Sequence, residues 1–285
     1  MKTIEIPGKT FLFGEYLATQ GGSSLVFTSK PLFALTGQQT PLSVPCPFHP
    51  DSPAGKLFKC HQDVLQHHEF SFINPYQHGG LGASTAEFLG LYQYTQAFID
   101  LKPLNAAEFV KLYQSLSSKQ GIKPSGSDLI AQKQRGISYF HPNEKKQKSH
   151  TWTFDELSLL LFHTNQKLAT HEHLQSLNLA VDLSNLQVIA NRAYDAFKQA
   201  NEIVFIHEIN TYGGALNALN LVEKHTLAIL NTLKREPRVL AAKGCGALGA
   251  DVFMVLCKPH HKKTLINELT QKGYPLMATE IDLCR

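Results

Sequence analysis

Alternating hydrophobic and polar residues predict strands over the first part of the chain. Residues 3–6 alternate, Pro7-Gly8 interrupts them, and residues 10–13 form a second short strand. Residues 25–27 and 31–35 continue this β-rich region. Pro, Ser and Gln between residues 37 and 56 predict turns and a loop. Two further strands are expected, at residues 57–59 and 70–73.

The pattern then changes to helical spacing. Phe88, Leu91, Tyr92, Phe98 and Ile99 recur at this spacing and predict a helix to about residue 99. Later elements are expected as helices at 106–118, 183–199, 214–233 and 262–272, a helix start at 171–178, and strands at 136–140, 157–163, 252–257 and 276–282. A polar linker at 142–150 places a domain boundary near 150, giving domains 1–150 and 151–285. The mixture of helices and strands predicts an α+β class.

Composition limits the classes of function. The 285 residues are 43% hydrophobic with net charge +4, which indicates a globular chain suited to small anions. One basic run, Lys145-Lys146-Gln147-Lys148, is interpreted as a solvated loop, so we expect no nucleic-acid partner. Five widely spaced cysteines without a CxxC pair favour reduced thiols in a cytoplasm. Residues 1–6 lack a signal-peptide core, and no apolar run is long enough to span a membrane.

Residues 79–85 are the most informative segment. Gly79, Gly80 and Gly82 allow close backbone approach, while Ser84 and Thr85 stand where a helix N-cap is expected. A flexible loop that opens into a helix presents free N–H groups at the positive end of the helix dipole, which suits a phosphate. A surface turn before an ordinary helix is the alternative interpretation of this segment taken alone.

Two other glycine-containing segments carry polar groups suited to the same task. Residues 7–16 read Pro-Gly-Lys-Thr-Phe-Leu-Phe-Gly-Glu-Tyr, and residues 243–251 read Lys-Gly-Cys-Gly-Ala-Leu-Gly-Ala-Asp. Gly8-Lys9-Thr10 is not a P-loop, because Thr3 stands where that motif needs a glycine.

Together with Pro124-Ser125-Gly126-Ser127-Asp128, these segments resemble the motifs of the GHMP family of small-molecule kinases, in the family's order. The likeness is to its mevalonate kinase and phosphomevalonate kinase branch, and Phe162-His163-Thr164 with Thr170 faintly resembles a further segment of it. The resemblance implies a ribosomal protein S5-like N-terminal domain, a ferredoxin-like C-terminal domain and an active site between them. It also implies an ATP- and Mg-dependent kinase, possible homodimerisation, and phosphomevalonate or mevalonate as acceptor.

The resemblance assigns roles residue by residue. Lys9 and Asp128 are the expected catalytic residues. Lys9 would lower the pKa of the attacking oxygen or steady the transferring charge, and Asp128 would accept or orient the proton of that oxygen. ATP would be bound by Gly80, Leu81, Gly82, Ala83, Ser84 and Thr85, and Ser84 would also contact Mg. Lys243, Gly246 and Gly249 are expected at the substrate.

Several residues depart from the family pattern. Ala83 replaces a serine, Thr85 an alanine, and Leu248 and Ala250 replace glycines. Ser117 stands where mevalonate kinases place a magnesium-binding glutamate. These departures motivate a second hypothesis, a GHMP-fold sensor that binds a metabolite without catalysis. Homoserine or a sugar as acceptor is a third hypothesis. A nucleic-acid module is a fourth, which the modest charge disfavours.

The remaining candidates are weaker. The preference for phosphomevalonate rests on Tyr16 and the 243–251 pattern, and Lys133 or Arg135 would supply cations for its phosphate. Cys245 is interpreted as a small buried residue, because no histidine partner is near it in sequence. The 14 histidines lack the spacing of a zinc site, so the pairs among them are interpreted as surface residues.

Overall fold

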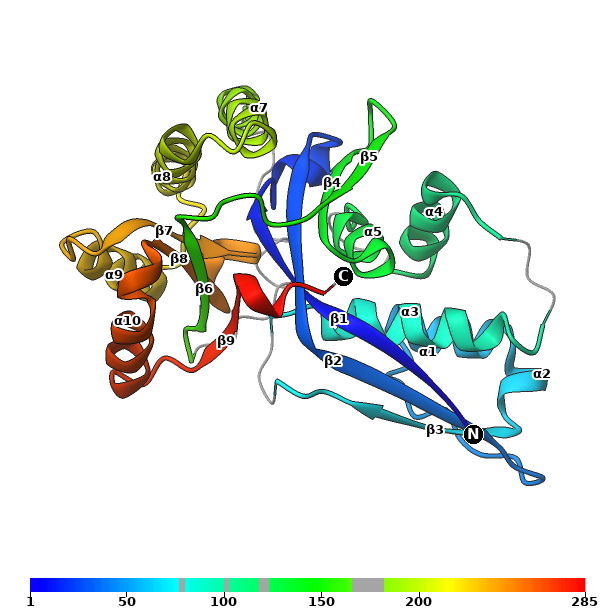
Figure 1. Ribbon diagram of the computed structural model, residues 1–285. Helices are drawn as coiled ribbons and strands as arrows, with labels where there is room; N and C mark the ends of the chain where they lie inside the picture. Colours follow the sequence, from blue (N-terminus) through cyan, green and yellow to red (C-terminus); the bar gives the residue numbers. More distant parts are fainter. Residues whose placement is uncertain (77–79, 100–102, 118–122, 166–181, 285) are drawn as a thin grey trace.

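In the computed structural model, two antiparallel sheets lie side by side, each with its own helices (Figure 1). The structure describes residues 1–76, 80–99, 103–117, 123–165 and 182–284. The first sheet has the order β1-β2-β4-β5, with β3 also paired to β2. Its strands are β1 Lys2–Phe13, β2 Ser24–Gln39, β3 His68–Ile73, β4 Ile137–His141 and β5 Lys146–His150.

Strands β1 and β2 are longer than the sequence pattern predicted. Residues 3–6 and 10–13 belong to one strand, because Pro7-Gly8 only shifts the register against β2: Pro7 pairs with Leu32 and Gly8 with Ser29. Residues 25–27 and 31–35 likewise join in β2. The residues predicted as a linker at 142–150 contain β5, an exposed edge strand that pairs with β4. Backbone pairing therefore overrides local interruptions in the hydrophobic pattern.

Helices cover one side of this sheet. They are α1 Pro53–Cys60, α2 Gln62–Leu65, α3 Ala83–Thr95, α4 Ala106–Leu116 and α5 Ser127–Gln134. The strand predicted at 57–59 was wrong: these residues form part of α1, because Ser52 caps the helix by accepting from the Gly55 N–H and Pro53 occupies its first turn. Helix α3 ends at Thr95, four residues before the predicted end.

The second sheet has the order β7-β8-β6-β9, built from β6 Ser158–His163, β7 Val239–Cys245, β8 Val252–Cys257 and β9 Leu276–Thr279. With helices between β6 and β7 and between β8 and β9, this is the predicted ferredoxin-like arrangement. The single helix expected at 214–233 is two helices, and β7 was not foreseen. The helices are α7 Ser184–Lys198, α8 Glu202–Ala218, α9 Lys224–Leu233 and α10 Pro259–Gln271.

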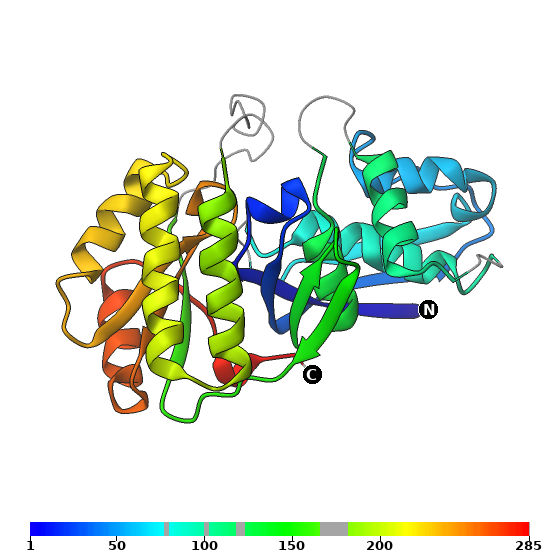
Figure 2. The same ribbon diagram turned by 90° about the horizontal axis from the view of Figure 1, so that it is seen from above.

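The apolar run of β6 is buried on both faces, as a central strand should be. Leu159 and Leu161 face the main core, which contains residues from both sheets, whereas Leu160 and Phe162 face a smaller core under α9 and α10. The C-terminal tail then returns to the first sheet, where the Cys284 N–H donates to the Thr28 carbonyl (Figure 2). The two sheets are thus joined by packing as well as by the chain. The predicted boundary near 150 stays a prediction.

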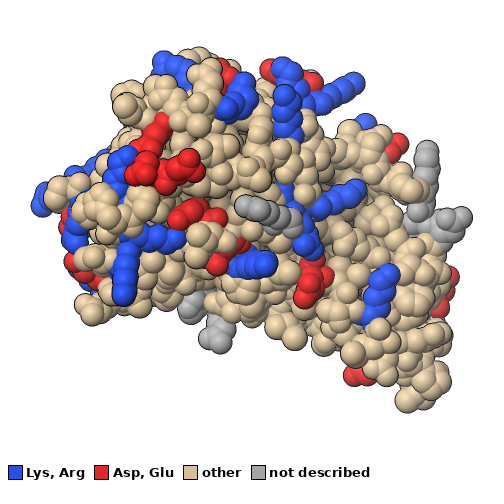
Figure 3. All heavy atoms as spheres, in the orientation of Figure 1, with Lys and Arg blue, Asp and Glu red and all other residues tan. Residues whose placement is uncertain are grey.

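The outside of the molecule carries mixed charge. On the face shown in Figure 3, lysine and arginine side chains are dispersed among acidic and neutral ones, without a continuous basic area. In the described part of the chain, no helix combines the length and the apolar character that crossing a membrane requires.

Candidate active site

The first turn of α3, with residues 80–82 before it (together called the phosphate loop), has the geometry of an anion site. The helix begins at Ala83, and its N-cap is Gly82 with φ 88°, so the predicted N-cap role of Ser84 or Thr85 was wrong. Gly80 also has positive φ, at 95°. No side chain caps α3, which leaves the N–H groups of its first turn pointing out of the helix start. Those donors, with the helix dipole, suit a phosphate.

Lys9 lies directly against this loop. Its backbone N–H donates to the Leu81 carbonyl at 3.0 Å, which fastens the loop to β1. Its side chain passes beside Gly82: a Cβ on Gly82 would lie 2.8 Å from Lys9 Cγ and 3.0 Å from Lys9 Cε. The Lys9 ammonium lies 4.9 Å from the centre of the Phe11 ring. Glycine at 82 is therefore required by both its backbone angle and the lysine stem.

Asp128 reaches the same helix from the other side. It lies in the first turn of α5, after Gly126 with φ 76°. The Thr85 hydroxyl donates to Asp128 Oδ2 at 2.9 Å, so the Tyr113 hydroxyl, 3.2 Å from Thr85 Oγ1, must donate to Thr85 in turn. Burial and the charge of Asp128 raise the pKa of Tyr113, which keeps this donor protonated. The chain of hydroxyls holds Asp128 beside the first turn of α3.

The third glycine segment is anchored to the end of β1. Lys243 Nζ lies 2.8 Å from Glu15 Oε1, with the side chains 1% and 3% exposed, and the Leu248 N–H donates to the Tyr16 hydroxyl at 2.7 Å. Leu248 has φ 53°, so it adopts the left-handed backbone of the glycine it replaces. Burial by itself lowers the pKa of Lys243, but the Cys245 thiol and the Glu15 carboxylate outweigh it and raise that pKa.

The third segment also contacts the phosphate loop. A Cβ on Gly80 would lie 2.4 Å from the Cβ of Asp251, so these two residues are in tight contact. Gly249 packs against Gly244, where an added Cβ would lie 2.7 Å from Gly244 Cα. Gly246 has φ 84° and open space where a side chain would be. The three glycine segments, far apart in sequence, therefore meet.

The predicted residues do not all face the same space. Lys9, Gly80, Gly82, Ser84 and Asp128 surround the start of α3, and Ala83 is its first residue. Leu81 and Thr85 have buried side chains, so any contact from them to a nucleotide would come from the backbone. Gly79 and Thr170 lie outside the described residues.

Lys243 and the two expected cations have other surroundings. Lys243 is enclosed and paired with Glu15, which gives no support to its predicted contact with a substrate. Lys133 and Arg135 lie at the opposite end of α5 from Asp128, where Lys133 Nζ is 4.7 Å from the centre of the Phe109 ring and Arg135 donates to the Glu5 carbonyl.

The side-chain oxygen atoms near the start of α3 are of the kind that magnesium binds. Ser84 is exposed in the first turn of α3, and the hydrogen bond from Thr85 holds the Asp128 carboxylate beside that turn. Among the described residues, no group of three or more His, Cys, Asp or Glu side chains is placed to hold a metal ion. Magnesium needs no such cage, because substrate phosphates and water complete its shell. Ser117 instead ends α4, its hydroxyl donating to the Tyr113 carbonyl.

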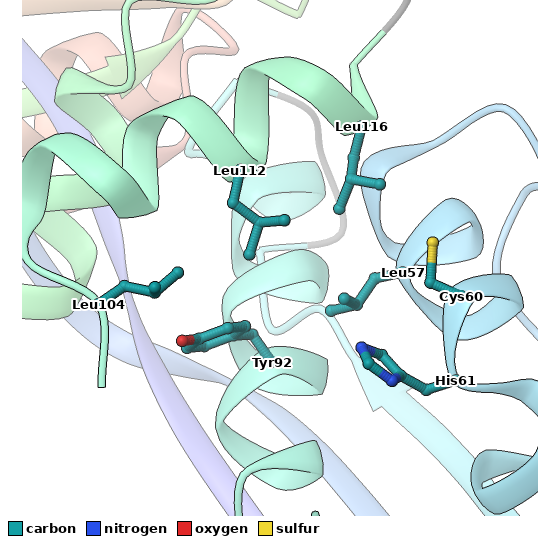
Figure 4. A pocket seen from close by; sticks show the side chains of 7 residues that line it. All are labelled: Leu57, Cys60, His61, Tyr92, Leu104, Leu112 and Leu116. Atoms are coloured by element: carbon teal, nitrogen blue, oxygen red, sulfur yellow. The ribbon is translucent and has the colours of Figure 1, made fainter. Parts of the chain in front are cut away.

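A separate apolar cavity of about 230 Å³ lies farther along α3. Figure 4 shows the side chains that line it, from α1, the residue between α1 and α2, α3, the residues before α4, and α4: Leu57, Cys60, His61, Tyr92, Leu104, Leu112 and Leu116. Tyr92 is seven residues beyond Thr85, or roughly 10 Å along the helix axis. The cavity is thus distinct from the phosphate loop.

The burial of their side chains tests the predictions for Cys245 and for the paired histidines. Cys245 is buried as predicted, and burial raises its pKa to about 11, which makes it a poor nucleophile at neutral pH. His68 is buried against Tyr94 and Phe98, so the prediction that the paired histidines lie on the surface was wrong for this one. His171 and His173 lie outside the described residues.

Comparison with solved structures identifies the fold. Streptococcus pneumoniae phosphomevalonate kinase, in a complex with phosphomevalonate and AMPPNP, superposes with a TM-score of 0.80 at 16% identity, over 98% of this chain and 99% of that one. Methanococcus jannaschii mevalonate kinase superposes with a TM-score of 0.74 at 17% identity, over 100% of this chain and 98% of that one. Lactococcus lactis galactokinase complexed with galactose has a TM-score of 0.73 at 14% identity, over 98% of this chain and 92% of that one. No protein-family model and no curated protein matches the sequence significantly.

The chain therefore has the GHMP kinase fold over its whole length, as the sequence motifs predicted. At these identities the likeness concerns the fold, and the activity has to be argued from the site.

Proposed function

We propose that this chain is an ATP-dependent kinase that transfers the γ-phosphate to a small-molecule acceptor. The observation that carries the proposal is the Thr85–Asp128 hydrogen bond of 2.9 Å, because it holds a carboxylate at the first turn of the phosphate-loop helix. Lys9 lies against Gly82 of the same loop. Phosphoryl transfer needs mainly positioning and neutralisation of charge, and this arrangement supplies both.

Each group has a role in such a transfer. The N–H groups at the start of α3 would bind the β- and γ-phosphates, and the Lys9 ammonium would steady the charge on the transferred group. Asp128 would accept the proton of the attacking oxygen, helped by the hydroxyl chain that keeps it in place. Ser84 would contact magnesium, with phosphate oxygens and water completing the shell, and magnesium would neutralise phosphate charge when bound.

Phosphomevalonate and mevalonate are the acceptors we propose first. Support comes from the motif pattern and from the likeness to phosphomevalonate kinase, whose structure contains both phosphomevalonate and an ATP analogue. A sugar or homoserine is the alternative within this fold, and the galactokinase likeness keeps the sugar in consideration.

A coupled assay of ADP release tests the proposal, with mevalonate, phosphomevalonate, homoserine and galactose offered separately. We expect ADP release that depends on one acceptor and on magnesium. Binding of AMPPNP without turnover on any of the four acceptors would favour a non-catalytic metabolite sensor. Absence of nucleotide binding would contradict both the kinase and an ATP-binding sensor.

A further inference from the structure

A buried amide lies at the centre of the candidate site. Gln132 is 2% exposed and stands on α5 one turn after Asp128, on the same side of the helix. Its Nε2 donates to the Pro7 carbonyl at 2.8 Å and to the Gly82 carbonyl at 3.2 Å. One side chain therefore joins β1, the phosphate loop and the helix of Asp128.

The bond to Gly82 orients the donors of the loop. Because a peptide unit is planar and trans, its C=O and the following N–H point in opposite directions. The Gly82 carbonyl accepts from Gln132 and from the Ala86 N–H at 2.9 Å, so it points along α3, away from the start of the helix. The N–H of Ala83, on the same peptide unit, consequently points outward from the start of α3, toward the place where an anion would bind.

The hydrogen bond to the Pro7 carbonyl fixes the backbone of β1 just before Lys9. Pro7 lies where the β1–β2 register shifts, so the regular ladder is interrupted there. Gln132 supplies a donor to its carbonyl, two residues before Lys9. The fit is tight, since a Cβ on Gly82 would lie 3.0 Å from Gln132 Nε2 as well as 2.8 Å from Lys9 Cγ.

We propose that Gln132 is a positioning residue, which aims the Ala83 N–H at a terminal phosphate and fixes the β1 backbone that carries Lys9, while Asp128 is held one helical turn away. The inference rests on the proposed kinase function. A position set by side-chain hydrogen bonds matters for rate, because displacement of reacting groups by about 1 Å can cost 10²-fold in turnover.

The test compares Gln132→Met with Gln134→Met. Methionine has similar length but no amide, so both bonds to carbonyls are lost. Gln134 lies on the same helix, and its Oε1 instead accepts from Ser138 and Gln147. We expect Gln132→Met to lower kcat for the identified acceptor about 10- to 100-fold, with acceptor KM changed less than threefold, and Gln134→Met to keep wild-type kcat.

Hydrogen exchange provides a readout without any ligand. In the full-length chain, Gln132→Met should accelerate about tenfold the exchange of the Ala86 amide, which donates to the Gly82 carbonyl, and of the Lys9 amide, which donates to the Leu81 carbonyl, while β6 keeps its wild-type rates. Wild-type kcat, or unchanged exchange at Ala86 and Lys9, would overturn the positioning role. If Gln132→Met does not fold, Gln132→Asn keeps an amide too short to reach both carbonyls and should give a smaller change of the same kind.

The two proposals fail in different ways. If the wild-type chain neither binds nucleotide nor turns over an acceptor, the kinase proposal is wrong, whereas the exchange measurement still decides whether Gln132 holds the loop. If the wild-type chain is an active kinase and Gln132→Met is equally active, only the positioning role is wrong.

Discussion

Thr85 shows how a departure from a motif can be part of a site. The resemblance leads one to expect alanine at this position, yet the threonine hydroxyl donates to Asp128 and receives a hydrogen bond from Tyr113. The sequence carried a signal for this contact, since a hydroxyl in place of the alanine of the loop motif needs a hydrogen-bond partner when it is buried. The partner itself is 43 residues away in the chain and was visible only after folding.

Replacing Asp128 with Asn tests the general base. The amide keeps the size of the side chain but cannot accept a proton, so we expect kcat to fall by about 10²- to 10⁴-fold. Affinity for AMPPNP, measured by calorimetric titration, should change less than threefold, because the donors of α3 remain. Comparable turnover in Asp128→Asn and wild type would remove Asp128 from the mechanism.

Glu87 makes a prediction about pH. It lies on α3 one turn after Ser84, and burial raises the pKa of its carboxyl above the ordinary 4.5. An acid with a raised pKa contributes stability that is fully present below its unfolded pKa and is lost as the pH rises through its folded pKa. Glu87→Gln should therefore have a higher Tm than wild type at pH 7.

The same reasoning predicts that this difference in Tm closes as the pH falls through 4.5, because below that pH Glu87 becomes protonated in the unfolded state as well. Thermal unfolding of the two proteins from pH 4 to pH 8 would measure it. A gap that is constant across the range would show that the burial of the charge is not its cause.

The helix α3 and its loop form the element on which the site depends. Glycine at positions 80 and 82 is explained by positive φ and by close neighbours on two sides, Asp251 for the first and Lys9 for the second. The glycine pattern predicted a close backbone approach. It did not reveal that the backbone of these glycines lies close to other residues of the protein, Asp251 and Lys9, and not only to a ligand.

Gly82→Ala should therefore destabilise the fold and weaken nucleotide binding. The added Cβ would lie 2.8 Å from Lys9 Cγ at a φ of 88°, and we expect a loss of about 1–3 kcal/mol in the free energy of unfolding. Gly214→Ala is the matched control, since Gly214 lies in α8 with no atom within 4 Å of an added Cβ. That substitution should stabilise by about 0.5–1 kcal/mol. Urea unfolding of both variants measures the contrast, and equal effects would contradict it.

Across the whole molecule, contacts at the end of β1 join the two sheets. The buried Lys243–Glu15 pair connects β7 to the residues after β1, and the Gly14 N–H donates to the Tyr212 hydroxyl of α8. Gly14, Glu15 and Lys243 belong to two of the glycine segments singled out in the sequence, and Lys243 was expected at the substrate. In the folded chain, part of that polar chemistry is used to place the segments relative to one another.

Lys243→Met tests this connection. It leaves the carboxylate of Glu15 buried without its cation, and removing one partner of a buried ion pair costs about 3–5 kcal/mol. The control is the double variant Lys243→Met with Glu15→Gln, which should recover much of the loss because no charge is left buried. Equilibrium unfolding in urea would show the difference, and equal stability of Lys243→Met and wild type would contradict the role.

The pattern of residues was enough to predict the α+β class and to single out the three glycine segments, because local periodicity and short motifs encode these features. The ferredoxin-like second half followed from the family resemblance that those segments carry. Local patterns failed at residues 57–59, where a cap and a proline start a helix, and at the break between α8 and α9. The local pattern could not predict the hydrogen-bond partners of Thr85, Gln132 and Lys243. Each of these side chains is satisfied by a residue distant in the chain, up to 228 positions away for Lys243 and Glu15, and only folding brings such groups within hydrogen-bonding distance.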